Sequence, residues 1–412
     1  MPYEMKYLEL LSRQYPTKAA VSEEIINLSA ILNLPKGTEH FLADIHGEHE
    51  AFDHVMRNAS GVVRRKIDDA FGSTLTEKEK SELATLVYYP EERISLVKAQ
   101  FSCSMDEDEP GCQNPRIREW YTVMIERLIL LCRQSAYKYT RSKVRKALPK
   151  HYQYIIEELL HENEISVMKQ GYYRSIIENI VDIDRAEEFI VVIAQLIQKL
   201  VVDHLHIIGD IYDRGPGAEH VMDTLMAHHS VDIQWGNHDV LWIGAACGSL
   251  VCMADLVRIS MRYGNLETMQ DSYGLNLAPL VRLVNDHYQQ DYAPTFQVKI
   301  KQEALREKDL VLWSRMQKAI AVIAAKLEGQ LALRRPELDL ESRALLHRID
   351  YEKGTITLEG QVYELIDKDF PTVDPKNPYE LTQDEQYCRD RLAKSVHGSA
   401  RLQRHSPFLI DK

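Results

Sequence analysis

Apolar positions spaced three and four residues apart predict helices over much of the chain. The stretch from position 62 to 197 is charged and rich in helix formers, which predicts a mainly helical region. The clearest helical patterns occupy residues 3–14, 22–32, 120–131, 152–160, 186–200, 240–261 and 310–333. In the first of them, Tyr7, Leu8, Leu10 and Leu11 share one helix face.

Three short apolar runs predict buried strands, and each run ends at a polar cluster. Residues 41–43 lead into Asp44, residues 201–208 end in Gly209-Asp210, and residues 231–235 precede Gly236-Asn237. Around Glu359-Gly360, two further apolar runs predict a β-hairpin. Strands separated by helical segments are typical of an α/β architecture.

Bulk composition narrows the class of protein. The 412 residues are 45% hydrophobic and 27% charged, as in an ordinary globular protein. No apolar run approaches the 18 or so residues of a membrane span, and the first residues lack the apolar centre of an export signal, so we predict a cytoplasmic protein without a membrane partner. Six cysteines without a Cys-x-x-Cys pair predict reduced thiols.

The formal net charge of −12 does not favour a nucleic-acid partner. It also repels a phosphorylated ligand at long range. A phosphate site in this chain would therefore depend on local positive charge, supplied by metal ions or by a few arginines.

The three polar clusters are Asp44-Ile45-His46, the run from Gly209 to Gly215 (Gly-Asp-Ile-Tyr-Asp-Arg-Gly) and Gly236-Asn237-His238-Asp239. Loops at the carboxyl ends of strands in α/β sheets converge on one ligand site. Asp44, His46, Asp210 and Asn237 offer oxygen and imidazole atoms, which suit Mn, Fe, Zn or Mg. A carboxylate such as Asp210 can bridge two cations about 3.5–4 Å apart and so clamp a phosphate.

The three motifs differ in how strongly each one, taken alone, indicates a metal site. Asp-x-His arises by chance in a chain with 16 histidines, and a tight turn explains Gly-Asn-His-Asp adequately. Gly-Asp-x-x-Asp-Arg-Gly has five fixed positions and occurs by chance in such a chain on the order of once in ten thousand. All three motifs in this order, each behind a predicted strand, favour a metal site over a structural explanation.

These residues resemble the calcineurin-like metallophosphoesterases, which combine Asp-x-His, Gly-Asp-x-x-Asp-Arg-Gly and Gly-Asn-His-Asp/Glu. The resemblance implies that Asp44 and His46 bind a first metal ion and that Asn237 binds a second metal ion. It also implies that the Asp210 carboxylate bridges the two ions. It also implies three catalytic residues. His238 would protonate the leaving oxygen, Asp213 would orient His238, and Arg214 would grip the phosphoryl oxygens.

A wider resemblance covers essentially the whole chain. The opening from Lys6 to Pro16, the run from Asn33 to Glu48 and the separation of 166 positions from Asp44 to Asp210 are similar to the class III fructose-1,6-bisphosphatases of Firmicutes. The resemblance implies hydrolysis of fructose 1,6-bisphosphate to fructose 6-phosphate in gluconeogenesis, with Mn²⁺ as the usual metal. It also implies an α/β metallophosphoesterase β-sandwich flanked by helices and interrupted by a helical insertion.

We expect residues 1–63 to form the first part of this core, 64–197 the helical insertion, 198–370 the second part with the hairpin, and 371–412 a truncated C-terminal segment. The family's later strand–His-Gly and Gly-His-x-His motifs are not found after position 240. The later histidines 287, 347, 397 and 405 are predicted to be ordinary surface or core residues. We favour truncation, while completion of the site by another subunit or a separate polypeptide remains an alternative.

The sequence therefore predicts a metal-dependent fructose-1,6-bisphosphatase whose partner is a small sugar bisphosphate and whose activity truncation can impair. Another phosphatase of the same superfamily, acting on phosphoproteins or dinucleoside polyphosphates, is the runner-up. A non-catalytic remnant is the alternative from another class. A homo-oligomer is left open.

Overall fold

The computed structural model describes residues 3–102, 115–160, 167–299 and 306–412. The chain divides into two compact units, of which the first is Met1–His40 with His54–His204 and the second is Phe41–Asp53 with Leu205–Lys412. Of the six cysteines, Cys103 and Cys112 lie outside the described residues, and Cys132, Cys247, Cys252 and Cys388 are free thiols. Among the described residues, no helix is both long enough and apolar enough to cross a membrane.

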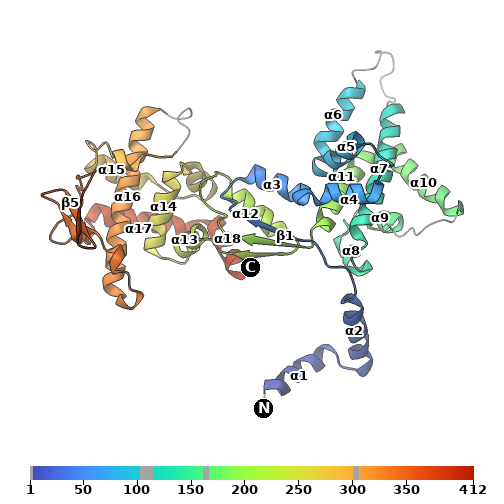
Figure 1. The fold of residues 1–412 in the computed structure, drawn as a ribbon, viewed down its shortest axis with the longest axis horizontal. Coiled ribbons are helices and arrows are strands. Elements are labelled where there is room, and N and C mark those ends of the chain that lie inside the picture. The colour runs from blue at the N-terminus through green and yellow to red at the C-terminus, as the bar shows by residue number, and fades with distance from the viewer. Residues whose placement is uncertain (1–2, 103–114, 161–166, 300–305) are drawn as a thin grey trace. The chain divides into compact units, whose positions relative to one another are not determined.

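The first unit is helical (Figure 1). Its longest described helix, α7 (Pro115–Ala136), packs against α11 (Ala186–Val201), and both bury a continuous apolar face that includes Leu128, Phe189 and Ile197. The other helices of this unit are α1 (Tyr3–Gln14), α2 (Lys18–Ile31), α4 (Val62–Phe71), α5 (Glu77–Tyr88), α6 (Pro90–Ser102), α8 (Arg141–Ala147), α9 (Gln153–Leu160) and α10 (Val167–Asp182). Helix α3 (His49–Asn58) and the 3-10 turn η1 (Ala59–Gly61) connect it to the second unit's first segment.

A three-stranded sheet, in the order β1-β2-β3, carries the polar clusters of the second unit. Its strands are β1 (Glu39–Ala43), β2 (His204–Ile208) and β3 (Val231–Gln234). Strands β2 and β3 are parallel, with Leu205 opposite Val231 and Ile207 opposite Ile233. These four side chains are buried, and their alternation with more exposed neighbours explains why such short segments adopt strands.

Helices make up most of the remainder of the second unit. They are α12 (Ala218–Ala227), α13 (Asn237–Ala246), α14 (Leu250–Arg262), the π-helix η2 (Thr268–Ser272), α15 (Ala278–His287), η3 (Pro294–Phe296), α16 (Glu307–Arg334), η5 (Pro336–Leu338), η6 (Glu341–Arg343), η7 (Leu346–Arg348), α17 (Gln383–Gly398) and α18 (Ala400–Asp411). A second, antiparallel sheet has the order β4-β5-β6 and the bounds Ile349–Asp350, Thr355–Leu358 and Gln361–Glu364.

The structure confirms a mixed α/β chain and most of the predicted elements, with two corrections. The predicted strand 201–208 begins only at His204, because buried Val201 still belongs to the apolar face of α11. The predicted helix 240–261 is two helices, because Gly248 has a φ of 96° and Ser249 caps α14 by accepting the Cys252 N–H. The predicted hairpin is strands β5 and β6, joined by Glu359 and Gly360 in left-handed conformations.

The β-sandwich of the predicted fold stays unconfirmed. The described residues form two sheets of three strands each, and Figure 1 shows α13, α14, α16 and α17 between β1 and β5. The two sheets therefore do not pack face to face. The predicted domain boundaries likewise stay predictions.

Candidate metal centre

The three motif loops follow the three strands of the first sheet. Asp44 comes directly after β1, Gly209-Asp210 after β2 and Gly236-Asn237 after β3. Because β2 and β3 are parallel, their carboxyl ends lie at the same edge of the sheet. Backbone hydrogen bonds join the first two loops: His46 N donates to Asp210 O at 2.7 Å, and Gly47 N donates to Ile211 O at 2.8 Å.

His46 is the centre of the candidate metal site. Its Nε2 atom lies 3.9 Å from Asp44 Oδ1 and 3.8 Å from Asp210 Oδ2, while its Nδ1 lies 3.2 Å from the Tyr212 carbonyl oxygen. Donation from Nδ1 to that carbonyl would leave Nε2 as the ligand atom that faces the two carboxylates. His46 is buried, whereas 77% of the Asp44 side chain is exposed, so the group opens to solvent on the Asp44 side.

Ligand atoms of His46, Asp210 and His238 all lie within 4.8 Å of one another, a spacing at which they could hold a metal ion. Carboxylate oxygen and imidazole nitrogen are donors that suit Mn, Fe and Zn. His46 and Asp210 therefore fit a divalent cation, whereas His238 is engaged by Asp213 at its Nδ1. Asn237 is exposed as the first residue of α13; its neighbour His238 donates its backbone N–H to Asp210 Oδ1 at 3.2 Å.

His238 and Asp213 form a buried pair beside these ligands. His238 Nδ1 donates to Asp213 Oδ2 at 2.8 Å, and the His238 ring meets the His46 ring edge to face with centroids 5.4 Å apart. The hydrogen bond to Asp213 raises the pKa of His238 above its ordinary value, while burial and the nearby Arg214 oppose the rise. This pairing engages Nδ1 of the imidazole and fixes the orientation of the ring.

Asp213 is held in turn by two groups that no motif includes. Its Oδ1 atom accepts from Ser260 Oγ at 3.1 Å and from Trp242 Nε1 at 3.4 Å. Both donors are buried and come from α14 and α13. Arg214, by contrast, is exposed, with a left-handed φ of 73°. Its exposed guanidinium is free to meet a ligand from solvent.

Asp239, the last residue of the third motif, has no exposed surface and connects two loops. Its Oδ1 accepts from the backbone N–H of Ile211 at 2.8 Å and of Tyr212 at 3.2 Å, and its Oδ2 accepts from Gly236 N at 2.9 Å. Burial raises the pKa of this carboxyl, although the three backbone hydrogen bonds oppose the rise. Sequence reasoning assigned Asp239 no role, and only its place in the motif pointed to it.

Glycines allow the loops to approach one another. A Cβ atom on Gly236 would overlap the Asp210 carboxylate, and one on Gly47 would come within 2.5 Å of Gly215 O. Gly47 also has a φ of 67°, a conformation that L side chains rarely adopt. The glycines of the motifs are therefore required by backbone geometry at these contacts.

The four later histidines, at positions 287, 347, 397 and 405, contact residues outside the candidate metal site or lie on the surface. His405 is fully buried between Tyr273 and Asp223, and His287 pairs with Asp384 at 2.9 Å. His347 contacts Tyr379, and His397 is an exposed residue of α17.

Comparison with known proteins bears on the whole chain. The family model of Firmicute fructose-1,6-bisphosphatase matches residues 6–412. A class 3 fructose-1,6-bisphosphatase of Clostridium novyi (strain NT) is 53% identical over 409 residues, which cover 99% of this chain and 60% of the relative. That of Clostridium botulinum (strain Langeland) is 52% identical over 405 residues, covering 98% and 59% respectively.

This chain thus spans about 60% of the length of these curated relatives. No solved structure matches it. The family match includes all three motif loops and both units described above. The chain belongs to the Firmicute fructose-1,6-bisphosphatase family.

Proposed function

We propose that this chain forms the metal- and phosphate-binding part of a cytoplasmic enzyme that hydrolyses fructose 1,6-bisphosphate to fructose 6-phosphate and phosphate, a step of gluconeogenesis. The observation that carries the proposal is the meeting of three loops around His46 Nε2, 3.9 Å from Asp44 and 3.8 Å from Asp210, beside the His238–Asp213 pair. The substrate is taken from the printed names of the relatives.

Each motif residue has a role in the proposal. Asp44, His46, Asp210 and Asn237 would hold divalent cations, for which we propose Mn²⁺. The bound cations supply positive charge that stabilises the phosphoryl oxygens and compensates for the chain's net charge of −12. Arg214 would bind two phosphoryl oxygens at once, because a guanidinium matches their spacing.

His238 would donate a proton to the oxygen of the sugar as it leaves. An alkoxide is a poor leaving group, so protonation is required at that atom. Asp213 keeps Nδ1 of His238 engaged at 2.8 Å and leaves Nε2 for the substrate. Ser260 and Trp242 restrict the Asp213 carboxylate, which keeps the imidazole in one orientation.

The ligand set around His46 is small for a dinuclear site, and we propose that further ligands come from polypeptide beyond these 412 residues. The match covers 60% and 59% of the two relatives, so each relative contains sequence outside the matched part. Reading the nucleotide sequence after codon 412 tests this point. An in-frame continuation with Gly-His-x-His supports completion within one chain, whereas a stop codon without such a motif requires ligands from another polypeptide.

The activity itself is tested on the purified 412-residue chain with MnCl₂ and fructose 1,6-bisphosphate, by an enzyme-coupled assay for fructose 6-phosphate. We expect Asp210→Asn to lower turnover and Mn²⁺ affinity by more than about 100-fold, because a carboxylate proposed to hold the metal is lost. Asp271→Asn, which changes an exposed carboxylate on η2, serves as the matched control and should leave both unchanged.

Other outcomes would reject the proposal. Fast hydrolysis of a phosphopeptide or a dinucleoside polyphosphate, without hydrolysis of the bisphosphate, would favour another phosphatase. Absence of both activity and bound Mn²⁺, measured by elemental analysis with the polypeptide that completes the site present, would favour a non-catalytic remnant.

A further inference from the structure

Three residues, Gly215 to Gly217, follow Arg214 and lead into helix α12; they are named the exit turn here. Gly215 N donates to His46 O at 2.7 Å, and Gly217 N donates to Gly47 O at 2.9 Å. The backbone N–H groups of the exit turn are therefore bonded to the first motif loop. Its carbonyl oxygens point to other partners.

Two buried side chains from the segment after α14 hold these carbonyl oxygens. Asn265 Nδ2 donates to Gly215 O at 3.2 Å, and Thr268 Oγ1 donates to Pro216 O at 2.7 Å. Thr268 is the first residue of the π-helix η2, and π-helical turns occur frequently at functional sites. Because both donors lie in the interior, they satisfy carbonyl groups that would otherwise lose their hydrogen bonds to water.

A third side chain of the same segment holds the first turn of α12. Ser272 Oγ donates to Glu219 Oε1 at 2.7 Å, and Glu219 is buried. The side chains of Asn265, Thr268 and Ser272 are named the clamp. They grip the chain on the far side of Arg214, just as Asp239 grips it on the near side through the backbone of the second motif loop.

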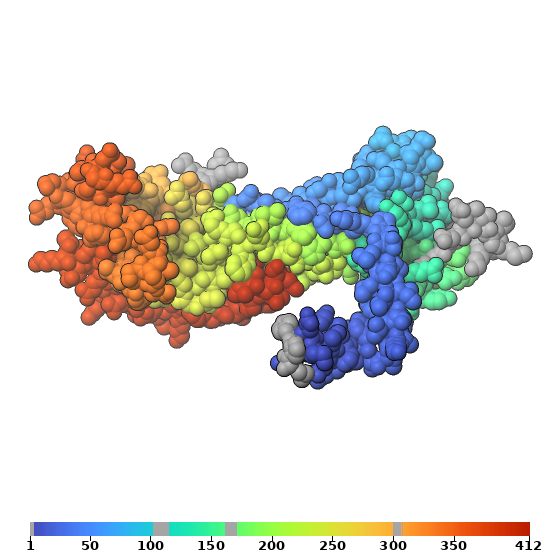
Figure 2. Space-filling view, turned by 60° about the horizontal axis from the view of Figure 1, so that its bottom comes forward, coloured from blue at the N-terminus to red at the C-terminus, as the bar shows by residue number. Residues whose placement is uncertain are grey.

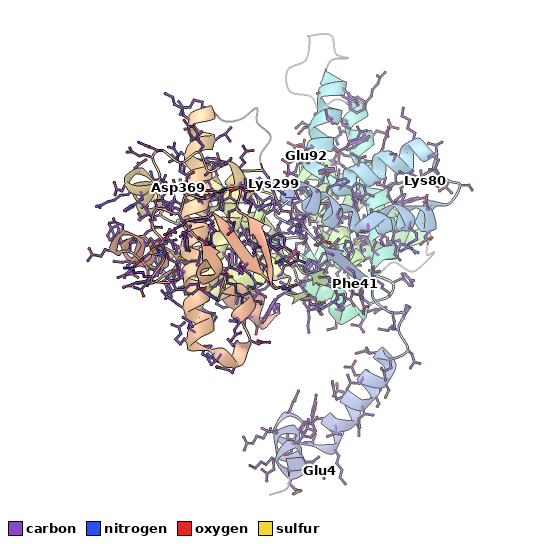
Figure 3. The ribbon with its side chains drawn as sticks, turned by 60° about the vertical axis from the view of Figure 1, so that its left-hand side comes forward. Glu4, Phe41, Lys80, Glu92, Lys299 and Asp369 are labelled. Carbon is purple, nitrogen blue, oxygen red and sulfur yellow. The ribbon has the colours of Figure 1, made fainter. Side chains whose placement is uncertain are left out.

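The clamp belongs to the body of the second unit. In Figure 2 the yellow-green to yellow atoms of that unit form one continuous mass. Figure 3 labels Lys299, whose backbone N–H donates to Arg262 O at 2.7 Å, at the end of α14 and shortly before the clamp begins. The segment that carries the clamp is thus itself held by the chain around it.

Arg214 lies between two fixed points. Before it, the Asp213 carboxylate accepts from Ser260 and Trp242; after it, Gly215 is bonded at both its N–H and its carbonyl. Asp213 and Arg214 have left-handed φ values of 65° and 73°. Such conformations persist in non-glycine residues only where the surroundings enforce them. On the side that follows Arg214, the clamp supplies this enforcement.

We propose that Asn265 and Thr268 are positioning residues, which fix the exit turn and thereby direct the Arg214 guanidinium at the phosphoryl group of the substrate. The inference rests on the proposed function, in which Arg214 binds phosphoryl oxygens. The Arg214 side chain is exposed, so its direction depends on the backbone that carries it. A mobile backbone would spoil the match between the guanidinium and two oxygens, and a displacement of about 1 Å can cost about 100-fold in rate.

The first experiment tests the grip without any ligand. Hydrogen exchange of the natural chain is compared with that of Thr268→Val, which keeps the side-chain shape and removes the hydroxyl, and of Asn265→Ala. We expect the Gly215 and Gly217 amides to exchange at least about tenfold faster in both variants, because a carbonyl of the exit turn loses its donor. Thr85→Val removes a hydroxyl that donates to a backbone carbonyl within α5 and is the matched control; it should leave both amides unchanged.

The second experiment tests the effect on Arg214. Inorganic phosphate is titrated calorimetrically in the presence of MnCl₂ and of the polypeptide that completes the metal site. Arg214→Ala and Thr268→Val should each weaken phosphate binding at least about tenfold. The double variant should bind no more weakly than Arg214→Ala alone, because Thr268 acts through that side chain. Thr268→Ser, which keeps the hydroxyl, should bind phosphate within about threefold of the natural chain.

The outcomes separate the inference from the proposed function. Unchanged exchange of both amides in Thr268→Val would overturn the clamp, whatever the substrate is. A loss of phosphate affinity that is equal with and without Arg214, or no loss at all, would overturn the positioning role. If the natural chain binds no phosphate although the exchange result holds, the proposed function fails and the inference falls with it.

Discussion

Replacing Asp239 by asparagine tests how the motif loops are held together. The Asp239 carboxylate accepts N–H groups from Ile211 and Tyr212 in the second loop and from Gly236 in the third. An amide has a single oxygen, so it can satisfy the Ile211 and Tyr212 donors or the Gly236 donor. Its NH₂ group would face the remaining N–H, and two donors cannot bond to each other.

The expected cost follows from these contacts. Losing one hydrogen bond to a charged acceptor costs about 1.5–3 kcal/mol, and the unpaired N–H adds to that cost. The neutral amide is easier to bury than the carboxylate, whose pKa burial raises, and this offsets part of the loss. We expect a net cost of about 2–3 kcal/mol in the stability of the loop contact.

Hydrogen–deuterium exchange measures this cost at the amides concerned. A local opening that becomes easier by about 2–3 kcal/mol speeds exchange of the Ile211, Tyr212 and Gly236 amides by about 30- to 150-fold. Because His46 N and Gly47 N bond to carbonyls of Asp210 and Ile211, Mn²⁺ affinity should fall as well. Unchanged exchange at all three amides in Asp239→Asn, beside an unaffected Asp271→Asn control, would refute the reasoning.

Three further predictions concern the second unit. Gly236→Ala should reduce Mn²⁺ affinity at least about tenfold in calorimetry, because its Cβ overlaps the Asp210 carboxylate, whereas Gly398→Ala, with open space around it, should not. Lys326→Met should cost about 3–5 kcal/mol in urea unfolding, because Glu385 would lose a fully buried partner at 2.7 Å; adding Glu385→Leu should recover part of the loss. Burial lowers the pKa of His405, so the unfolded chain takes up its proton first as the pH falls; stability from this group is present above about pH 6.5 and is lost below it. Urea midpoints of His405→Gln should therefore change less between pH 7 and pH 5 than those of the natural chain.

Local patterns in the sequence predicted the elements well because helical spacing and strand alternation report burial directly. Helix 3–14 and the hairpin around Glu359 have nearly the predicted bounds. The break at Gly248 was missed because the apolar pattern continues across it. A backbone turn that leaves the pattern intact has no signature in periodicity alone.

In the candidate site too, some residues could be predicted from local sequence patterns and others could not. The motifs identified Asp44, His46 and Asp210, and the carboxylates of Asp44 and Asp210 each lie within 4 Å of His46 Nε2. Ser260 and Trp242 were missed, because they reach Asp213 from 47 and 29 residues away along the chain. Such supporting contacts depend on how helices pack, and no local pattern encodes them.

Backbone conformation at the motif loops explains how the ligand spacing is set. Asp44, His46, Asp210, Asp213 and Arg214 all have positive φ, five of the eleven such non-glycine residues that the described parts of the chain contain. Each costs of order 1–3 kcal/mol and persists only where the surroundings enforce it. The surroundings here are the other loops: His46 N bonds to Asp210 O, and Gly215 N bonds to His46 O at 2.7 Å. The loops therefore fix each other's strained conformations in the folded chain, and the positions of the ligand atoms follow from contacts among loops rather than from any one motif.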